Sequence, residues 1–307
     1  MLWALATVLL WSGAGYSSAR CARNWGTATA NRMRLGLASV LLCGLCLLLG
    51  TLPLYSASWW YLGAGVLHLG LGDLCLFAAY RLIGPRLGVL VCGTLGIPVA
   101  LLLEWVILGN VPPAVALVLV VGVIAGVIIA FAPAERLRLG DRSVRLGLLM
   151  GTLAALGQGG SQAVQRVGAA KMAELGLSMD AFAGALCRSS GGLAVLLVMW
   201  GVTGALRHRG DVAASYGSST TRLDGQTGRR VWPWLLVSTG FGPILGIGAL
   251  TLALESTEAV LVQAVIATLP VWMIPWAWVL DGDRPSLRSL LGGALAVGCV
   301  AGMVWLR

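Results

Sequence analysis

Long apolar runs, separated by short polar breaks, occupy almost the whole chain. A helix needs about 20 mostly apolar residues to cross the hydrocarbon core of a bilayer, and ten such runs can be placed here. The predicted spans are roughly 2–19, 34–51, 59–80, 87–108, 114–132, 145–165, 180–203, 232–252, 258–280 and 287–306. The longest break, 205–231, is rich in Gly, Ser, Thr and Arg and is expected to be a flexible loop. The pattern predicts an all-α integral membrane protein with ten transmembrane helices.

The composition supports a membrane protein. Of the 307 residues, 58% are hydrophobic and only 11% are charged, whereas a soluble domain has about 25% charged residues. A water-soluble fold is excluded, because a globule must cover its surface with polar groups. We expect a multi-pass protein of a cell membrane, either plasma or inner, with the lipid bilayer as its surroundings.

The net charge of +9 does not indicate a nucleic-acid partner. The cations are almost all Arg, Lys171 is the only lysine, and they lie between apolar runs rather than on one basic face. Cys43 and Cys46 form a C-x-x-C inside an apolar run, without a second Cys pair. Helix packing is therefore preferred to a metal site, and neither a metal nor another cofactor is expected.

Most of the cations belong to one side of the membrane. They are assigned to the breaks after the odd-numbered spans, Arg34 among them, and the other side holds only Arg166, Lys171, Arg188 and Arg307. The positive-inside rule then puts the odd-numbered breaks in the cytoplasm and both termini outside.

The two halves of the chain repeat one pattern in the same order. The matching segments are "EWVILGNVPP" (104–113) with "AWVLDGDRPS" (277–286), "VGVIAGV" (121–127) with "VGCVAGM" (297–303), "LGDLCLFAA" (71–79) with "LGIGALTLA" (245–253), and Arg20 with Arg166. Residues 1–132 and 145–306 are therefore interpreted as two copies of one five-helix unit. Since five is odd, the second copy must enter the membrane upside down. Such an inverted repeat is the architecture of many secondary transporters.

Small residues recur at matching positions of the last helix in each half. They form two small-x-x-x-small pairs, which permit close approach of helix backbones. The glycines expected to pack helices are Gly122, Gly126, Gly298 and Gly302.

Several stretches are typical of one transporter superfamily. "LLWSGAGYSSARCAR" (9–23) resembles its first helix. "ANRMRLGLA" (30–38) and "ALCRSSGGLA" (185–194) resemble the Arg-bearing starts of its second and seventh helices. "GIPVALLLEWVILGN" and "ATLPVWMIPWAWVLDGD" resemble its fourth and ninth helices. In this order and spacing the chain resembles the EamA-like ten-helix members of the drug/metabolite transporter (DMT) superfamily.

The resemblance implies a transporter rather than an enzyme, with a central substrate cavity. Two departures are visible. The Glu that follows Leu-Gly in the family is Asn110 in the first half and Asp283 in the second. The family usually keeps both termini in the cytoplasm, opposite to the charge count. Carried over by position, the cavity residues are Trp11, Ser12, Tyr16, His68, Asp73, Gln158, Gln162, Gln263 and Trp272.

Asp73 is also singled out by its place in the sequence. It lies well inside an apolar span, where a charged group usually faces a cavity, a partner or a proton path. It is our candidate for proton coupling, and a structural hydrogen-bonding role is the alternative. His68 lies five residues earlier, about 140° away on a regular α-helix, so the two side chains are not expected to share a face.

Other polar residues have weaker expectations. Gln158, Gln162 and Gln165 form one stripe on an apolar helix, which either wets a cavity or bonds neighbouring helices. Glu104 lies one turn from a helix end and is expected to reach the interface, and Glu255 and Glu258 are expected to be solvated. Pro270 and Pro275 are expected to kink or break their span.

The predicted function is secondary-active transport of a small molecule by alternating access. Export of a small metabolite or amino acid is favoured, with proton coupling through Asp73 as a further hypothesis. No Walker-type nucleotide-binding motif is present. A non-transporting membrane scaffold and an intramembrane lipid-modifying enzyme remain the alternatives, although the sequence has neither clustered acids nor a Ser-His pair in a suitable context.

Overall fold

The computed structural model describes residues 1–109, 113–131, 141–208, 225–281 and 287–305, and within them it consists of helices without β-strands. The first half contains α1 (Leu2–Trp25), α2 (Thr27–Leu49), α3 (Ser58–Gly65), η1 (Val66–Gly72), α4 (Asp73–Leu108) and α5 (Ala114–Phe131). The second half contains α6 (Arg142–Glu174), α7 (Ala181–His208), α8 (Gly225–Thr239), η2 (Gly240–Ile244), α9 (Leu245–Ser256), α10 (Ala259–Ile266), α11 (Leu269–Asp281) and α12 (Leu287–Trp305). The prediction of an all-helical fold is confirmed.

Within the described residues, six helical stretches are long and apolar enough to cross a membrane. They are 27–49, 58–85, 87–107, 181–203, 231–256 and 259–276, and two shorter apolar helices cover 117–129 and 291–302. The count of ten spans stays a prediction. Two predicted spans, 59–80 and 87–108, meet inside α4 at Gly84, whose φ of 82° is a backbone conformation that favours glycine.

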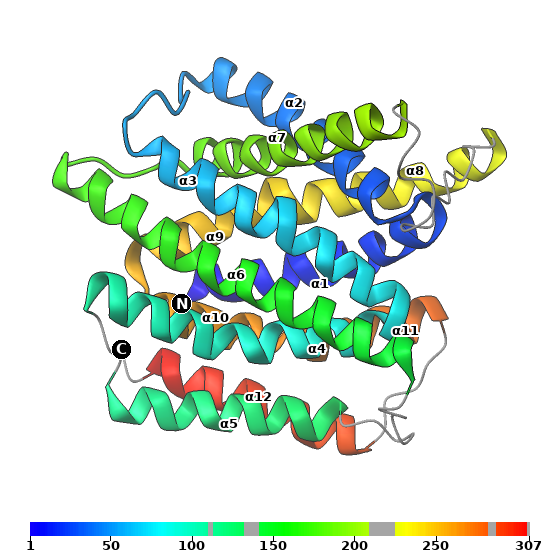
Figure 1. Ribbon diagram of the computed structural model, residues 1–307. Helices are drawn as coiled ribbons and strands as arrows, with labels where there is room; N and C mark the ends of the chain where they lie inside the picture. The colour runs from blue at the N-terminus through cyan, green and yellow to red at the C-terminus, as the bar shows by residue number, and fades with distance from the viewer. Residues whose placement is uncertain (110–112, 132–140, 209–224, 282–286, 306–307) are drawn as a thin grey trace.

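Helices from the two halves lie side by side. α5 packs along α12 at one edge of the molecule, and α2 packs along α7 at the opposite edge. Between these edges, α1 contacts α8 and α9, while α6 contacts α3, η1 and α4. Figure 1 shows that the start of α1 and the end of α12 lie at the same end of the bundle.

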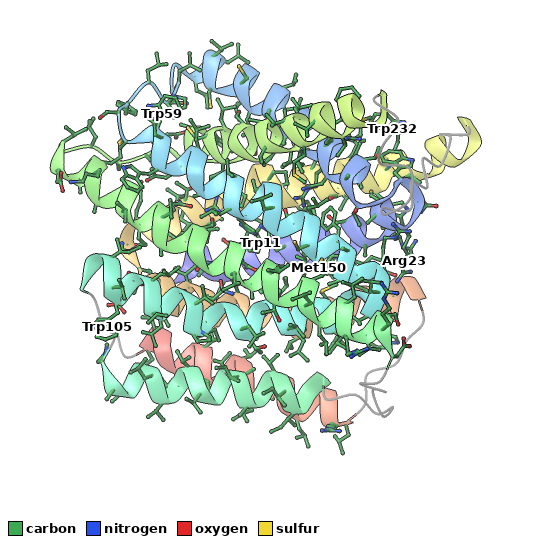
Figure 2. All side chains as sticks on the ribbon, viewed as in Figure 1. Trp11, Arg23, Trp59, Trp105, Met150 and Trp232 are labelled. Atoms are coloured by element: carbon green, nitrogen blue, oxygen red, sulfur yellow. The ribbon has the colours of Figure 1, made fainter. Side chains whose placement is uncertain are left out.

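The outer surface is apolar. Large hydrophobic side chains are exposed along the outer helices, among them Val40 and Leu48 on α2, Val118 and Val121 on α5, and Leu291 on α12. Figure 2 shows side chains projecting outward all around the bundle, with Trp59 and Trp105 near one end. A surface of this kind is suited to contact with lipid rather than water.

Two irregularities in the helices involve proline. The break expected from Pro270 and Pro275 is confirmed at Pro270, because α10 ends at Ile266 and α11 begins at Leu269, whereas Pro275 lies inside α11. The second is η2, a π-helix that contains Pro243. This residue has no N–H group to donate to the backbone hydrogen bonds of the helix.

The predicted loop at 205–231 contains helix at both of its ends. α7 continues to His208 and α8 begins at Gly225, so helix replaces both ends of the predicted loop. Residues 209–224 lie outside the described part of the chain.

Candidate functional site

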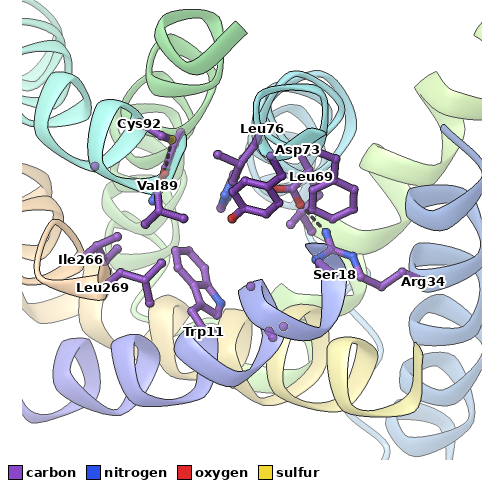
Figure 3. Close-up of a pocket in the computed structure, with 18 residues that line it drawn as sticks. Trp11, Ser18, Arg34, Leu69, Asp73, Leu76, Val89, Cys92, Ile266 and Leu269 are labelled. Carbon is purple, nitrogen blue, oxygen red and sulfur yellow. Dashed lines mark hydrogen bonds and ion pairs between the residues drawn. The ribbon is translucent and has the colours of Figure 1, made fainter. Parts of the chain in front are cut away.

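A pocket lies at the centre of the bundle, where helices of both halves meet. The wall is contributed by α1, α2, η1 and α4 from the first half and by α6, η2, α10 and α11 from the second. Its empty volume is about 570 Å³ including the open mouth. Figure 3 shows Trp11, Asp73, Arg34 and Ile266 around this space.

Four of the predicted cavity residues line the pocket: Trp11, His68, Asp73 and Gln158. The ring of Trp11 meets the ring of His68 edge-on, with 5.3 Å between centroids. Gln158 accepts a hydrogen bond from the Cys92 thiol at 2.9 Å. The remaining five predicted residues lie outside the pocket lining.

His68 and Asp73 share one face, so the expectation that they point apart was wrong. Residues 66–72 form a π-helix, in which N–H groups bond to the carbonyl five residues earlier. The Asp73 N–H reaches the His68 carbonyl in this way. A residue and its fifth successor then lie closer to one face than the α-helical step of 100° allows, and both His68 and Asp73 line the pocket.

Asn31 on α2 stabilises the π-helix η1. In an α-helix the Leu69 carbonyl would accept from the Asp73 N–H. Here Asn31 Nδ2 donates to that carbonyl instead, at 2.7 Å, and Asn31 is fully buried. Asn31 was not predicted from the sequence, since nothing in the α2 pattern shows that a carbonyl on another helix needs a donor.

Asp73 is paired with Arg34 inside the protein. Arg34 Nη2 donates to Asp73 Oδ2, and both side chains are almost fully buried. The guanidinium also lies over the Phe77 ring, with Cζ 5.1 Å from the centroid. Arg34 was expected to be a loop cation. That expectation was wrong, because α2 begins at Thr27 and places Arg34 in the pocket wall.

A second buried arginine stands behind His68. Arg188 on α7 has no solvent exposure. Its Nη2 donates to His68 Nδ1 at 2.9 Å and to Ser161 Oγ at 2.8 Å, and its Nη1 donates to Gln165 Oε1. Gln165 of the predicted stripe therefore bonds a neighbouring helix and does not wet the pocket.

The predicted residues outside the pocket lining bond or pack against other side chains of the bundle. Gln162 Nε2 donates to Gln263 Oε1 at 2.5 Å, and Gln263 Nε2 donates to the Gly93 carbonyl at 3.3 Å. Ser12 accepts from Trp276 Nε1 at 3.0 Å. Tyr16 accepts from Arg20 at 3.0 Å. Trp272 is half-buried against the apolar core.

Glu104 is buried, and the expectation that it reaches the interface was wrong. Its side chain is 1% exposed and accepts from Arg166 Nε at 3.2 Å. Its second oxygen accepts from the Ala259 N–H at 2.6 Å and the Val260 N–H at 3.4 Å, which belong to the first turn of α10. The carboxylate therefore ties α4 to α6 and to a helix N-terminus, where negative charge is favourable.

Glu255 is half-buried rather than fully solvated. It accepts a hydrogen bond from the Met179 N–H at 2.8 Å. This contact joins the end of α9 to the segment that precedes α7.

The four packing glycines occupy different surroundings. A Cβ at Gly126 would lie 2.6 Å from the Ala296 nitrogen on α12, and one at Gly122 would lie 2.6 Å from Cys299 Sγ. A Cβ at Gly302 would make ordinary contact with Leu119 at 3.5 Å, and one at Gly298 would meet nothing within 4 Å. The tight contact between α5 and α12 therefore depends on the α5 glycines.

Titratable side chains are not grouped as a metal site would require. Among the described residues, no three His, Cys, Asp or Glu side chains are placed to hold a metal ion. The polar wall of the pocket consists of single charged and amide groups held by their neighbours.

Solved structures share this fold. A chain described as "Crystal structure of protein" covers 99% of this chain and 96% of its own length, with a TM-score of 0.68 and 17% sequence identity. At this identity the likeness concerns the fold alone. A search of the curated proteins found no match.

A family model gives the identity of the sequence. The model of the EamA-like transporter family matches residues 1–132 and 212–305, which is more than half of the chain. The match agrees with the resemblance of the motifs, with the apolar outer surface and with the pocket between helices of both halves. This chain belongs to the EamA-like transporter family, and it is a multi-pass membrane protein of the drug/metabolite transporter type.

Proposed function

We propose that this protein is a secondary-active transporter that exports a small metabolite or amino acid, and that the central pocket is its substrate site. The observation that carries the proposal is the pocket wall, which combines buried charged groups with side chains from both halves. A pocket so placed changes its access when the halves move against each other.

Residues 1–132 and 145–306 are proposed to be the two inverted repeats that move in this way. The proposal is supported by contacts between helices at corresponding positions of the two repeats, since α5 packs on α12 and α2 packs on α7. The π-helices support it too: η1 and η2 start at Val66 and Gly240, the same offset that relates "LGDLCLFAA" to "LGIGALTLA". The matched family segments fall one in each half.

Asp73 is proposed to couple transport to protons. Its carboxylate is held by Arg34 at the pocket wall. Protonation of Asp73 would remove the ionic bond and release the guanidinium toward the pocket. Proton uptake would then change the charge that the substrate meets, which is what coupling requires.

The experiment compares metabolites released by cells that express the wild-type chain, the Asp73→Asn variant or no transporter. We expect selective release of one class of compound by the wild type and its loss in Asp73→Asn. Glu174→Gln is the matched control, because it makes the same carboxyl-to-amide change at an exposed pair with Lys171 on α6. It should release as much as the wild type.

Two results would contradict parts of the proposal. If Asp73→Asn transports with an unchanged pH dependence, the coupling role is wrong. If the wild type is inserted in the membrane but neither releases nor takes up any compound, transport through this pocket is wrong and the scaffold alternative gains support.

A further inference from the structure

The charges around the pocket do not balance. Of the described residues that line it, Asp73 is the only acid, and its charge is already matched by Arg34. Arg188 adds a second cation directly behind His68. Within the described part of the chain, Arg188 makes hydrogen bonds only to His68, Ser161 and Gln165, which are not acids. The site as a whole carries one positive charge more than negative.

His68 does not add a charge of its own, as its bond to Arg188 shows. A guanidinium has only N–H donors, so His68 Nδ1 must be the acceptor and carries no proton. The imidazole is therefore neutral, with its hydrogen on Nε2. Because His68 lines the pocket, Nε2–H is the polar atom that remains for a ligand, and it is a donor.

Both buried arginines also have donors without acceptors. Arg34 Nε and Arg188 Nε are buried, and neither finds an acceptor among the described residues. A buried donor left unpaired is unfavourable, and a buried charge without a counter-charge is more so. The wall thus presents excess positive charge and excess hydrogen-bond donors in the same place.

We propose that the pocket binds an organic anion. The inference rests on the proposed function, namely that this pocket is the substrate site. The anionic group, a carboxylate or a similar oxyanion, is bound by Arg34 and the His68 Nε2–H, and Arg188 stabilises its charge from behind. The apolar body of the substrate contacts Trp11, Leu76, Phe77, Ile266 and Leu269. One negative charge makes the occupied site neutral.

Other charge classes fit the wall less well. A cation finds only Asp73, which Arg34 occupies, and it adds to the positive excess. A zwitterion such as an amino acid has to separate Arg34 from Asp73 to use both, and it leaves the excess charge uncompensated. A neutral compound leaves the charge uncompensated as well. The substrate is therefore narrowed from small metabolites in general to those with net negative charge.

The test uses four probes with one ring and different charge. They are 3-phenylpropanoate, 3-phenylpropanamide, phenylalanine and phenethylamine. Binding to the purified full chain in lipid nanodiscs is measured for each. We expect the anion to bind about tenfold more tightly than the amide, because hydrogen bonds to a charged group are stronger than those to a neutral one. Equal or tighter binding of the amide, the amino acid or the amine would overturn the proposal.

A pair of variants tests the source of the preference. Arg188→Gln removes the charge behind His68 without changing the pocket lining, and the preference for the anion over the amide should fall. Arg32→Gln is the control, since Arg32 lies on the same helix as Arg34 but stacks on exposed Trp200, with Cζ 5.5 Å from its ring. It removes the same charge outside the pocket and should keep the preference. An unchanged preference in folded Arg188→Gln would refute the role of Arg188.

The failure of this inference can be told from failure of the proposed function. If none of the four probes binds, the net charge of the compounds released by expressing cells decides. Release of net-anionic compounds supports the inference, and release of neutral or cationic ones refutes it while transport stands. If nothing is transported, the proposed function fails and the anion site fails with it.

Discussion

Replacing Glu104 by Gln should destabilise the protein far more than the same carboxyl-to-amide change at an exposed acid such as Glu174. The Glu104 carboxylate is 1% exposed and accepts from two directions, the Arg166 guanidinium on one oxygen and the first turn of α10 on the other. An amide of the same size has only one acceptor oxygen. Its NH₂ group must face either Arg166 or the α10 N–H groups, which are themselves donors.

The expected loss follows from these contacts. One donor group becomes unpaired in a buried place, which costs about 1–3 kcal/mol, and the remaining hydrogen bond loses its charge assistance, about 1 kcal/mol more. Arg166 keeps its bond to the Leu254 carbonyl at 2.8 Å, so the total stays below the upper end of about 4 kcal/mol, at about 3 kcal/mol. At about 2 °C per kcal/mol for a chain of this size, the melting temperature should fall by roughly 6 °C.

The assay is thermal unfolding of the purified protein in detergent, followed by size-exclusion chromatography of the fraction that stays soluble. Glu174→Gln is again the control, because its pair with Lys171 is exposed, with N–O separation 2.9 Å. Exposed pairs of this kind contribute about 0.3–0.5 kcal/mol, so the control should melt within about 1 °C of the wild type. If Glu104→Gln melts no lower than Glu174→Gln, the buried carboxylate does not hold these helices together.

Two further predictions concern helix packing. Gly126→Ala should lower the melting temperature by several degrees, since its Cβ would meet the backbone of Ala296 at 2.6 Å. Overpacking of this kind lowers the free energy of unfolding by about 1–3 kcal/mol. Gly298→Ala, with nothing within 4 Å, should be neutral or slightly stabilising, and equal losses in the two variants would refute the packing argument. Gln263→Leu should be destabilising by about 1–3 kcal/mol, because it leaves the Gln162 amide unpaired. The double variant with Gln162→Leu should recover part of that loss in the same unfolding assay, and a strictly additive loss would contradict the amide pair.

The all-helical fold could be predicted from the sequence because it depends on apolar length alone. The break before Pro270 was predictable for a similar reason, since a ring without an N–H acts locally. Family membership was predictable from the order of motifs. None of these inferences needs to know which helix lies beside which.

The site was predictable only in part, because its geometry depends on contacts between distant helices. His68 and Asp73 share a face through a π-turn that Asn31 stabilises from another helix. A calculation that assumes regular α-helix cannot find it. Arg34 was mistaken for a loop cation for the same reason, since its partner Asp73 lies 39 positions away. The Gln stripe was identified correctly as polar, but only the packing separates Gln158 at the pocket from Gln165 at Arg188.

The motif "EWVILGNVPP" (104–113), which is repeated at 277–286, begins with Glu104, the residue that binds Arg166. Arg166 and Arg20 occupy matching positions. Arg166 is held by Glu104, and Arg20 lies over the Trp234 ring at 4.3 Å and donates to Tyr16. Figure 2 places Trp105, next to Glu104, and Arg23, near Arg20, at opposite ends of the bundle.

The Glu104 contacts join the two halves of the chain. The buried carboxylate on α4 bonds the Arg166 guanidinium on α6 and the N-terminus of α10. Under the proposed alternating access, these contacts must break before the Glu104 end can open, so they favour the access state in which that end is shut. The Glu104→Gln variant should then shift the equilibrium between the access states as well as lower the melting temperature. Access of a thiol reagent to a cysteine placed at each end would measure the shift: more labelling at the Glu104 end agrees with the bias, and unchanged labelling refutes it.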